Sequence, residues 1–278
     1  MRRAPLPGAP PGWVGLHQPA RPGAPTVVAL HGFTGTSLDW YEVYHHLPRA
    51  WGLLAPDLPG HGRSALPADR PFALDGTLDA LACVVAAATE GPRLLLGYSL
   101  GGRLALSWIT RPAHGFDAVV TVGASPGLSS AAERDARRAA DVELAGRIVH
   151  LGTRAFLDEW NAGPLFDGLR RVAPTVRRRV RAHRREAEPA GLAAALVGLS
   201  LGAMPPVHDA LTRVTVPALF TAGALDPRYL DLAAAMAART PGAASLAVQG
   251  AGHAAHLEAP KALAEHLVGF WKGAFRPA

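Results

Sequence analysis

Three residues able to cooperate in proton transfer each stand shortly after a predicted strand: Ser99, Asp226 and His253. A serine hydroxyl gains reactivity when a histidine accepts its proton, and a carboxylate fixes the imidazole tautomer and stabilises the imidazolium. The strands are expected at residues 93–98, 216–222 and 245–248. Because the carboxyl ends of parallel strands meet at one edge of a sheet, the sequence predicts that these three side chains form a catalytic triad.

The serine lies in the pentapeptide 97–101, which reads Gly-Tyr-Ser-Leu-Gly and separates an apolar run from an Ala- and Leu-rich segment. This sequence between a strand and a helix is typical of a nucleophile elbow, a strained turn that exposes the serine hydroxyl. Gly97 and Gly101 are small enough to let the strand and the helix approach each other. The pentapeptide alone also fits an ordinary strand-to-helix turn, and the later aspartate and histidine favour the elbow.

Other residues compete for two of these roles. His256 is the reserve candidate for the base, although the Gly-x-Gly-His context after a strand favours His253. Asp231 is the alternative acid, but it falls within a predicted helix and should point away from the serine. His61 and Asp57 lie in a turn-rich loop, and we interpret both as residues that shape this loop.

An oxyanion hole is expected from two backbone N–H groups. One belongs to Leu100, which follows the serine, and the other to Phe33, in the loop that follows a buried strand at residues 26–30. The small residues of this loop suit backbone that must expose its N–H groups. A plain tight turn at His31 is the alternative interpretation.

Strand and helix patterns alternate along most of the chain, which predicts an α/β fold with a mostly parallel central sheet flanked by helices. From residue 129 to residue 208 no strand pattern occurs, only Ala-, Arg- and Leu-rich helical segments. We predict that this stretch is a helical cap inserted after the sixth strand. The core is then expected at residues 1–128 and 209–278.

Length and composition agree with one large core. The chain has 278 residues, 49% of them apolar. Its one cysteine, Cys83, is expected to be a buried apolar residue, which excludes disulfide frameworks and cysteine-based zinc sites. No apolar stretch reaches the ~18 residues needed to cross a membrane, and no apolar signal core follows the first residues. We therefore expect a cytoplasmic protein.

The formal net charge is +6, and arginines crowd the middle of the chain, above all between residues 134 and 185. Nucleic-acid binding is not expected, because base-stacking aromatic residues and a known module are missing among these arginines. A solvated helix face accounts for most of them. An anionic small-molecule substrate is the better explanation for those that face the site. The oligomeric state does not follow from the sequence.

The chain order serine, aspartate, histidine resembles that of the α/β-hydrolase superfamily, and the resemblance extends over nearly the whole chain. Finer motifs in core and cap resemble one branch, the 2-succinyl-6-hydroxy-2,4-cyclohexadiene-1-carboxylate synthases of menaquinone biosynthesis. These motifs are residues 97–103, residues 124–128 with Glu133, Arg134 and Arg137, Trp160 with residues 164–166, and residues 251–258.

This resemblance implies a lyase. The family eliminates pyruvate from 2-succinyl-5-enolpyruvyl-6-hydroxy-3-cyclohexene-1-carboxylate and leaves the cyclohexadiene. Ser99, activated by His253, would abstract a ring proton, so that no acyl-enzyme forms, and the oxyanion hole would hold charge that develops on the succinyl carbonyl. No cofactor and no metal ion is expected.

The resemblance also implies which residues bind the substrate. The substrate carries three carboxylates, so arginines should line the pocket as bidentate partners, at Arg103, Arg137 and Arg184 by motif position. Aromatic side chains would pack on the ring and exclude water. The binding residues expected beside these arginines are His31, Tyr98, Trp160 and Phe166.

The sequence departs from the family pattern in the cap. Met204 stands where a glutamine is expected before a proline pair, and Val207-His208 replaces the usual Leu-Trp. Residues 186–188 read Glu-Ala-Glu, where the family has an asparagine-rich patch. A polar contact to the substrate is therefore expected to be missing, which bears on the exact substrate.

Two other functions fit parts of the pattern. A carboxylesterase or thioesterase would use the same triad for acyl transfer, but an apolar ester does not need Arg103 and Arg137 to converge on Ser99. A catalytically silent binding protein with this fold would not need an intact triad. Ester turnover separates the first of these alternatives from the elimination.

Overall fold

The computed structural model describes residues 1–66 and 73–275. Its strands form one eight-stranded sheet in the order β1-β2-β4-β3-β5-β6-β7-β8. From β4 to β8 all neighbours are parallel, and only β2 and β1 add to the edge in antiparallel orientation. The strands are β1 (Ala4–Pro5), β2 (Val14–Gln18), β3 (Thr26–Leu30), β4 (Gly52–Pro56), β5 (Arg93–Tyr98), β6 (Ala118–Val122), β7 (Ala218–Gly223) and β8 (Ala244–Val248). The predicted mostly parallel sheet is confirmed.

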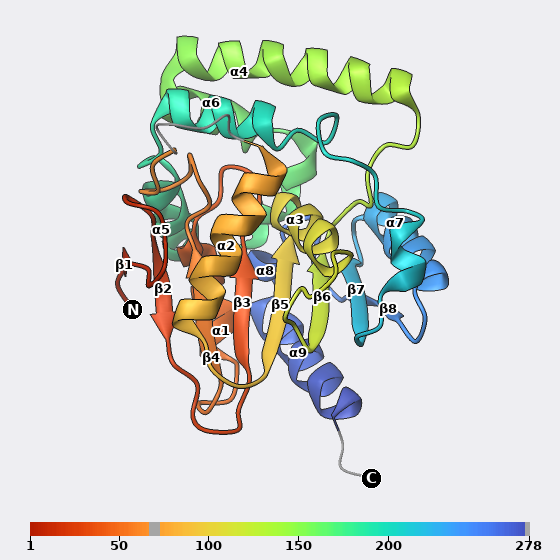
Figure 1. The fold of residues 1–278 in the computed structure, drawn as a ribbon. Helices are drawn as coiled ribbons and strands as arrows, with labels where there is room; N and C mark the ends of the chain where they lie inside the picture. Colours follow the sequence, from red (N-terminus) through yellow and green to blue (C-terminus); the bar gives the residue numbers. More distant parts are fainter. Residues whose placement is uncertain (67–72, 276–278) are drawn as a thin grey trace.

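Helices cover both faces of the sheet (Figure 1). In the core they are α1 (Tyr41–His45), α2 (Leu74–Ala88), α3 (Leu100–Ile109), α7 (Pro227–Arg239), α8 (Ala255–Glu258) and α9 (Pro260–Ala274), with the 3-10 helices η1 (Ser37–Trp40) and η3 (Ala210–Arg213). Alternate residues of β3 contact opposite layers. Val28 packs in one apolar cluster with α2, α3 and α7, whereas Val27 packs in the other with α1, α8 and α9. Two-sided burial explains why β3 and its neighbours are continuous apolar runs.

The helical insertion follows β6, the sixth strand, as predicted. It comprises α4 (Ala131–Trp160), the 3-10 helix η2 (Pro164–Arg171), α5 (Pro174–Arg184) and α6 (Pro189–Gly198). Figure 1 shows α4 and α6 across the end toward which the parallel strands point. We call these four helices and the segments that join them the cap. That residues 128 and 209 bound a separate unit stays a prediction.

Local sequence sets the shape of α4. Ser130 caps its first turn, since the serine side chain accepts from the N–H of Glu133 and the glutamate accepts from the N–H of Ser130. The helix bends at Gly152, where φ is 75°. Ile148 and Phe156, on either side of the bend, pack against Leu192 of α6 in a small apolar cluster of their own.

The expectation for the cysteine is wrong. Cys83 is exposed on α2, whereas Leu81 and Val84 are buried. The apolar run that contains it is helical, and a helix turns its residues around the axis by 100° each, so a side chain within an apolar run still reaches solvent.

Among the helices of the described residues, none has the length and apolar character that crossing a membrane requires.

The close approach of α3 to β3 generates a stability prediction. A Cβ atom at Gly101 would overlap the carbonyl groups of Leu30 and His31, which are backbone and cannot move aside. We expect Gly101→Ala to lower the free energy of unfolding by about 2 kcal/mol or more, in the range of overpacked core substitutions. Urea denaturation followed by tryptophan fluorescence measures the change.

Gly146→Ala is the matched control, because Gly146 lies inside α4 and a Cβ there meets no atom within 4 Å. Alanine is favoured over glycine by roughly 0.5–1 kcal/mol in a helix, so this variant should be slightly more stable than the wild type. Equal stability of the two variants would contradict the steric explanation.

Candidate active site

Ser99 occupies the turn between β5 and α3 with a strained backbone. Its φ is 49° and its ψ is −108°, a backbone conformation that residues other than glycine rarely adopt. Two hydrogen bonds hold the turn, from the Ser99 N–H to the carbonyl of Val122 at 2.9 Å and from the N–H of Arg103 to the Ser99 carbonyl at 2.9 Å. The structure therefore gives this serine the backbone of a nucleophile elbow.

The three residues predicted as a triad come together. Nε2 of His253 lies 3.3 Å from Oγ of Ser99, and Nδ1 of His253 lies 2.8 Å from Oδ2 of Asp226. Both His253 and Asp226 are more than nine-tenths buried. With Nδ1–H donated to the carboxylate, Nε2 is free to accept the serine proton.

The loop that carries the histidine is fixed by a buried carboxylate. Glu258 of α8 accepts from the N–H groups of Gly252 at 2.8 Å and Ala254 at 3.1 Å, on either side of His253. The imidazole packs beside the rings of Tyr98 and Tyr229, with ring centroids at 5.3 Å and 4.5 Å. These contacts leave the ring little freedom to turn away from the serine.

The competing candidates lie elsewhere. His256 is fully buried against Tyr98 and Trp40, and neither of its ring nitrogens has a partner among the described residues. Burial lowers the pKa of His256 well below its ordinary value, so the ring is neutral. Asp231 is exposed on α7. Neither His256 nor Asp231 forms a hydrogen bond with Ser99.

The loop after β3 lies directly against the serine. A Cβ atom at Gly32 would approach the ring of Tyr98 to 2.6 Å and the Cβ atom of Ser99 to 3.4 Å. Thr34, two residues further on, has a φ of 65°, which is strained for a β-branched residue. Within residues 1–66 and 73–275, the N–H groups of Phe33 and Leu100 have no acceptor, and both residues line the same pocket as the serine. This placement supports their predicted role as oxyanion donors.

Two buried neutral histidines hold that loop from behind. His31 donates from Nδ1 to the carbonyl of Gly32 at 2.8 Å and accepts at Nε2 from the N–H of Leu58 at 2.8 Å. His61 donates to the carbonyl of Pro59 at 3.1 Å, and its ring lies against those of His31 and Phe33. Burial lowers the pKa of His31 to about 4 and that of His61 to about 3.

Asp57 ties the neighbouring loop to three other segments. Its carboxylate accepts from the N–H and hydroxyl of Ser37, from the N–H of Arg63 and from the guanidinium of Arg3. Arg3 and Arg63 in turn bind Glu186 of the cap. These contacts agree with the interpretation of Asp57 and His61 as residues that shape the loop.

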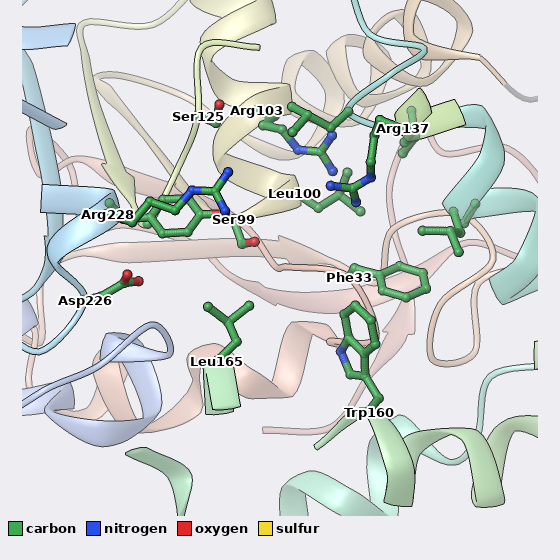
Figure 2. Close-up of a pocket in the computed structure, with 16 residues that line it drawn as sticks. Phe33, Ser99, Leu100, Arg103, Ser125, Arg137, Trp160, Leu165, Asp226 and Arg228 are labelled. Atoms are coloured by element: carbon green, nitrogen blue, oxygen red, sulfur yellow. The ribbon is translucent and has the colours of Figure 1, made fainter. Parts of the chain in front are cut away.

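A pocket of about 260 Å³ opens beside Ser99, between the sheet edge and the cap. Its apolar wall comes from both parts of the chain and consists of Phe33, Leu100, Trp160, Leu165, Ala195, Leu196, Leu199 and Leu201. Figure 2 shows the side chains of Arg103 and Arg137 directed into this space from one side, and Arg228 reaching toward Ser99 from another. The site thus offers an apolar surface together with three positive charges.

Arg103 is the most constrained of these cations. Its Nη1 atom is buried and has no partner among the described residues. Burial, and next the nearby Arg137, lower the pKa of Arg103 to about 10, so it stays protonated near neutral pH. Arg137 is held by Asp141, whose two carboxylate oxygens lie 2.9 Å from its Nε. The terminal nitrogens of Arg137 remain directed into the pocket (Figure 2).

Four of the predicted substrate-binding residues do not line this pocket. His31 and Tyr98 lie beneath it, and burial raises the pKa of Tyr98, so its phenol is neutral. Phe166 faces a neighbouring cavity and touches the His253 ring from the side, at 6.2 Å between centroids. The buried guanidinium of Arg184 is engaged with Asp39 at 2.7 Å, an ion pair that holds it away from the pocket. In this structure Arg184 is therefore not placed to contact a substrate in the catalytic pocket.

Several residues of the pocket were not predicted from the sequence. Arg228 and Tyr229 follow the triad aspartate by two and three residues, at the start of α7. Ser125 is the third polar residue that was missed, and Oγ of Ser125 accepts from the N–H of Gly127 at 3.2 Å. The signal that points to Arg228 is its position two residues after the predicted acid, where the chain passes from a post-strand loop into α7.

The departures from the family pattern lie outside the pocket. Met204 is buried in the apolar cluster around α2 and α3, where a polar side chain would lack a partner. Glu186 binds the arginines at positions 3 and 63, and Nε2 of His208 lies 3.2 Å from the Ser129 hydroxyl. None of these three is among the residues that line the pocket.

The comparisons with known proteins show the family of the chain. A family model described as alpha/beta hydrolase fold matches residues 25–260. Two curated relatives are named 2-succinyl-6-hydroxy-2,4-cyclohexadiene-1-carboxylate synthase. The one from Salmonella typhimurium is 32% identical over 90% of this chain and 95% of its own length, and the one from Citrobacter koseri is 33% identical over 89% and 94%.

Solved structures agree as well. The structure of MenH from S. aureus superposes with a TM-score of 0.88 and 25% sequence identity, and covers 95% of this chain and 99% of that one. A thermophilic esterase from Thermogutta terrifontis superposes with a TM-score of 0.81 at 23% identity over 99% of both chains, which shows a shared fold.

The buried histidines generate a prediction for stability against pH. His31 and His61 are neutral in the folded protein, whereas in the unfolded chain each takes up a proton near pH 6.5. The unfolded state therefore binds more protons below pH 6.5, and stability is lost as the pH falls from there toward 4 and 3. Between pH 7.5 and pH 5 we expect each to lower the free energy of unfolding by about 2 kcal/mol.

Urea denaturation of the wild type and of His61→Gln at the two pH values tests this. The variant should lose about 2 kcal/mol less than the wild type, because it removes one of the titrating rings. His45→Gln, at an exposed position, is the control and should keep the wild-type dependence. An unaltered pH dependence in His61→Gln would contradict the assignment.

Proposed function

The chain belongs to the α/β-hydrolase fold family, and from this membership we propose that it eliminates pyruvate from 2-succinyl-5-enolpyruvyl-6-hydroxy-3-cyclohexene-1-carboxylate in menaquinone biosynthesis. The product is 2-succinyl-6-hydroxy-2,4-cyclohexadiene-1-carboxylate, after which the curated relatives are named. The enzyme is then a carbon–oxygen lyase, and its substrate is a small anion.

One observation carries the proposal: arginine guanidinium groups face the space beside Ser99 in a pocket that is otherwise largely apolar. The Nη1 atom of Arg103 is buried and has no partner among the described residues, and a buried polar atom left unpaired is costly, so the pocket is suited to receive an anion there. The substrate carries three carboxylates on a ring. Arg103, Arg137 and Arg228 match these charges, and the apolar wall matches the ring.

Proton abstraction would begin at the serine. His253 accepts the proton of the Ser99 hydroxyl at Nε2, and Asp226 stabilises the imidazolium that results. The serine oxygen removes a proton from the ring carbon adjacent to the succinyl carbonyl. Negative charge then develops on that carbonyl oxygen, where the N–H groups of Leu100 and Phe33 would hold it.

The carbon–oxygen bond breaks next. The electron pair left at the deprotonated carbon forms a double bond to the next ring carbon. The original ring double bond then shifts by one position toward the carbon that bears the enolpyruvyl oxygen, and this oxygen leaves with the pair of the broken bond. The leaving group is the enolate of pyruvate, which takes up a proton and becomes the enol and then pyruvate. No covalent bond to Ser99 is needed, so the serine acts as a base.

An esterase or thioesterase function remains the second candidate, because the same triad and oxyanion donors serve acyl transfer. The arginines favour the elimination, since an uncharged ester would leave the buried Arg103 without a partner. A silent binding protein is the third candidate. The hydrogen-bond distances within the triad argue against it, because a binding role does not require them.

The decisive experiment is release of pyruvate from the purified enolpyruvyl substrate, measured by coupling to lactate dehydrogenase. We expect turnover by the wild type and a roughly 10²- to 10⁴-fold lower rate for Ser99→Ala, as for loss of a positioned base. Hydrolysis of p-nitrophenyl esters is measured in parallel. Rapid ester hydrolysis without pyruvate release would contradict the proposal and favour the second candidate.

The arginines of the pocket should contribute unequally to kcat/KM for the elimination. Arg103→Ala removes a buried cation from a carboxylate and should lower kcat/KM roughly 10²- to 10³-fold. Arg228→Ala, at an exposed position, should lower it roughly tenfold, mainly through KM, because solvent screens the contact. Arg239→Ala, at the other end of α7, is the control and should behave as wild type. An unchanged rate in Arg103→Ala would remove this arginine from the site.

A further inference from the structure

A second cavity, of about 110 Å³, lies between η2, α5 and α8, behind the wall of the catalytic pocket. Consecutive residues of η2 face opposite ways, because Leu165 lines the catalytic pocket and Phe166 lines the second cavity. Phe166, Val180 and Leu257 form its apolar part, and Asn161, Arg177 and Arg184 contribute polar atoms. None of these six residues has a part in the mechanism proposed above.

Three buried polar atoms on the residues that line this cavity lack partners among the described residues: Nε of Arg177, Nε of Arg184 and Oδ1 of Asn161. The asparagine amide is oriented by a hydrogen bond from its Nδ2 to the carbonyl of Leu157 at 2.7 Å, which leaves Oδ1 as an unused acceptor. Buried polar groups are nearly always satisfied, so this cluster is suited to a ligand that accepts two hydrogen bonds and donates one.

The second cavity carries one positive charge that no carboxylate of the described residues balances. Four arginines line it, and three of them are neutralised by aspartates. The pairs are Arg170–Asp167, Arg181–Asp158 and Arg184–Asp39. Arg177 has no carboxylate partner within residues 1–66 and 73–275. One uncompensated positive charge at a partly dry site calls for a monoanion.

The volume limits the size of that anion. A water molecule takes about 30 Å³ in the liquid, so the cavity holds a molecule of only a few heavy atoms. A carboxylate accepts from two guanidinium nitrogens at once, a hydroxyl on the next carbon can donate to Asn161, and a short carbon chain fits the apolar side near Val180.

We propose that this second cavity binds a short 2-hydroxy carboxylate. The source of such a ligand rests on the proposed function. The group that leaves in the elimination is the enolate of pyruvate, and once it has taken up a proton the enol carries a carboxylate and an O–H on the adjacent carbon. The cavity lies directly behind Phe166, whose ring touches that of His253, so it is placed to receive this leaving group.

The direct test measures binding of lactate to the full-length protein by isothermal titration calorimetry, without the enolpyruvyl substrate. Lactate carries the carboxylate and the hydroxyl, and propanoate, which lacks the hydroxyl, is its control. Wild type should bind lactate more tightly than propanoate. Arg177→Gln should weaken lactate binding at least tenfold, whereas Arg178→Gln, an exposed neighbour with the same charge change, should not.

A second variant guards against a folding defect. Asn161→Asp keeps the size of the side chain, supplies a carboxylate to Arg177 and should abolish lactate binding by repulsion. The melting temperature should fall, because the aspartate loses the hydrogen bond that Nδ2 donates to Leu157, while the circular dichroism spectrum stays that of the folded protein. Arg103→Ala should bind lactate as wild type does, because Arg103 lines the other pocket. No binding by wild type, wild-type affinity in Arg177→Gln, or loss of binding in Arg103→Ala would each overturn the proposal.

Turnover with the enolpyruvyl substrate tests the source of the ligand. If the leaving group passes through the cavity, Arg177→Gln should change kcat while a single turnover keeps its wild-type rate. An unchanged kcat would overturn the inference that the leaving group passes through the second cavity. Because lactate binding is measured without that substrate, failure of the elimination and failure of the second site are distinguishable.

Discussion

The close contact between the start of α3 and the end of β3 is the constraint on which the site depends. A helix can begin beneath Ser99 only because Gly101 presents no side chain to the carbonyls of Leu30 and His31. This approach gives the serine its positive φ, places Leu100 at the wall of the pocket and brings the loop with Phe33 beside it. Strain at one residue is tolerated because the surrounding sheet and helix fix it from both sides.

Buried charges then determine how the cap meets the core. Arg184 of α5 pairs with Asp39, and the same face carries the network that joins Asp57, Arg3 and Glu186 of the cap. Breaking one side of such a pair leaves an unpaired charge in the interior, which favours one arrangement of cap and core. These contacts also determine the shape of the catalytic pocket, because cap residues form its far wall.

Two kinds of cation follow from this arrangement. Arg184 pairs with Asp39 and attaches the cap to the core, although it also lines the second cavity. Arg103 and Arg177 face cavities and have no carboxylate partner within residues 1–66 and 73–275. Pairing with a fixed carboxylate uses the hydrogen-bonding capacity that an anionic ligand would need. One guanidinium group can serve both purposes, since Arg137 pairs with Asp141 through Nε and directs its terminal nitrogens into the pocket. The nitrogens without a protein partner, rather than the pairing itself, are therefore what a ligand can use.

The sequence alone determined the α/β fold, the insertion after the sixth strand and the three residues Ser99, Asp226 and His253, because strand and helix periods and post-strand loops are local signals. Only the tertiary structure decided which charges meet. It paired Arg184 with Asp39, joined Arg3 and Asp57 to Glu186, and placed Arg228 beside the serine. Those outcomes depend on contacts between segments far apart in the chain, which no local spacing encodes.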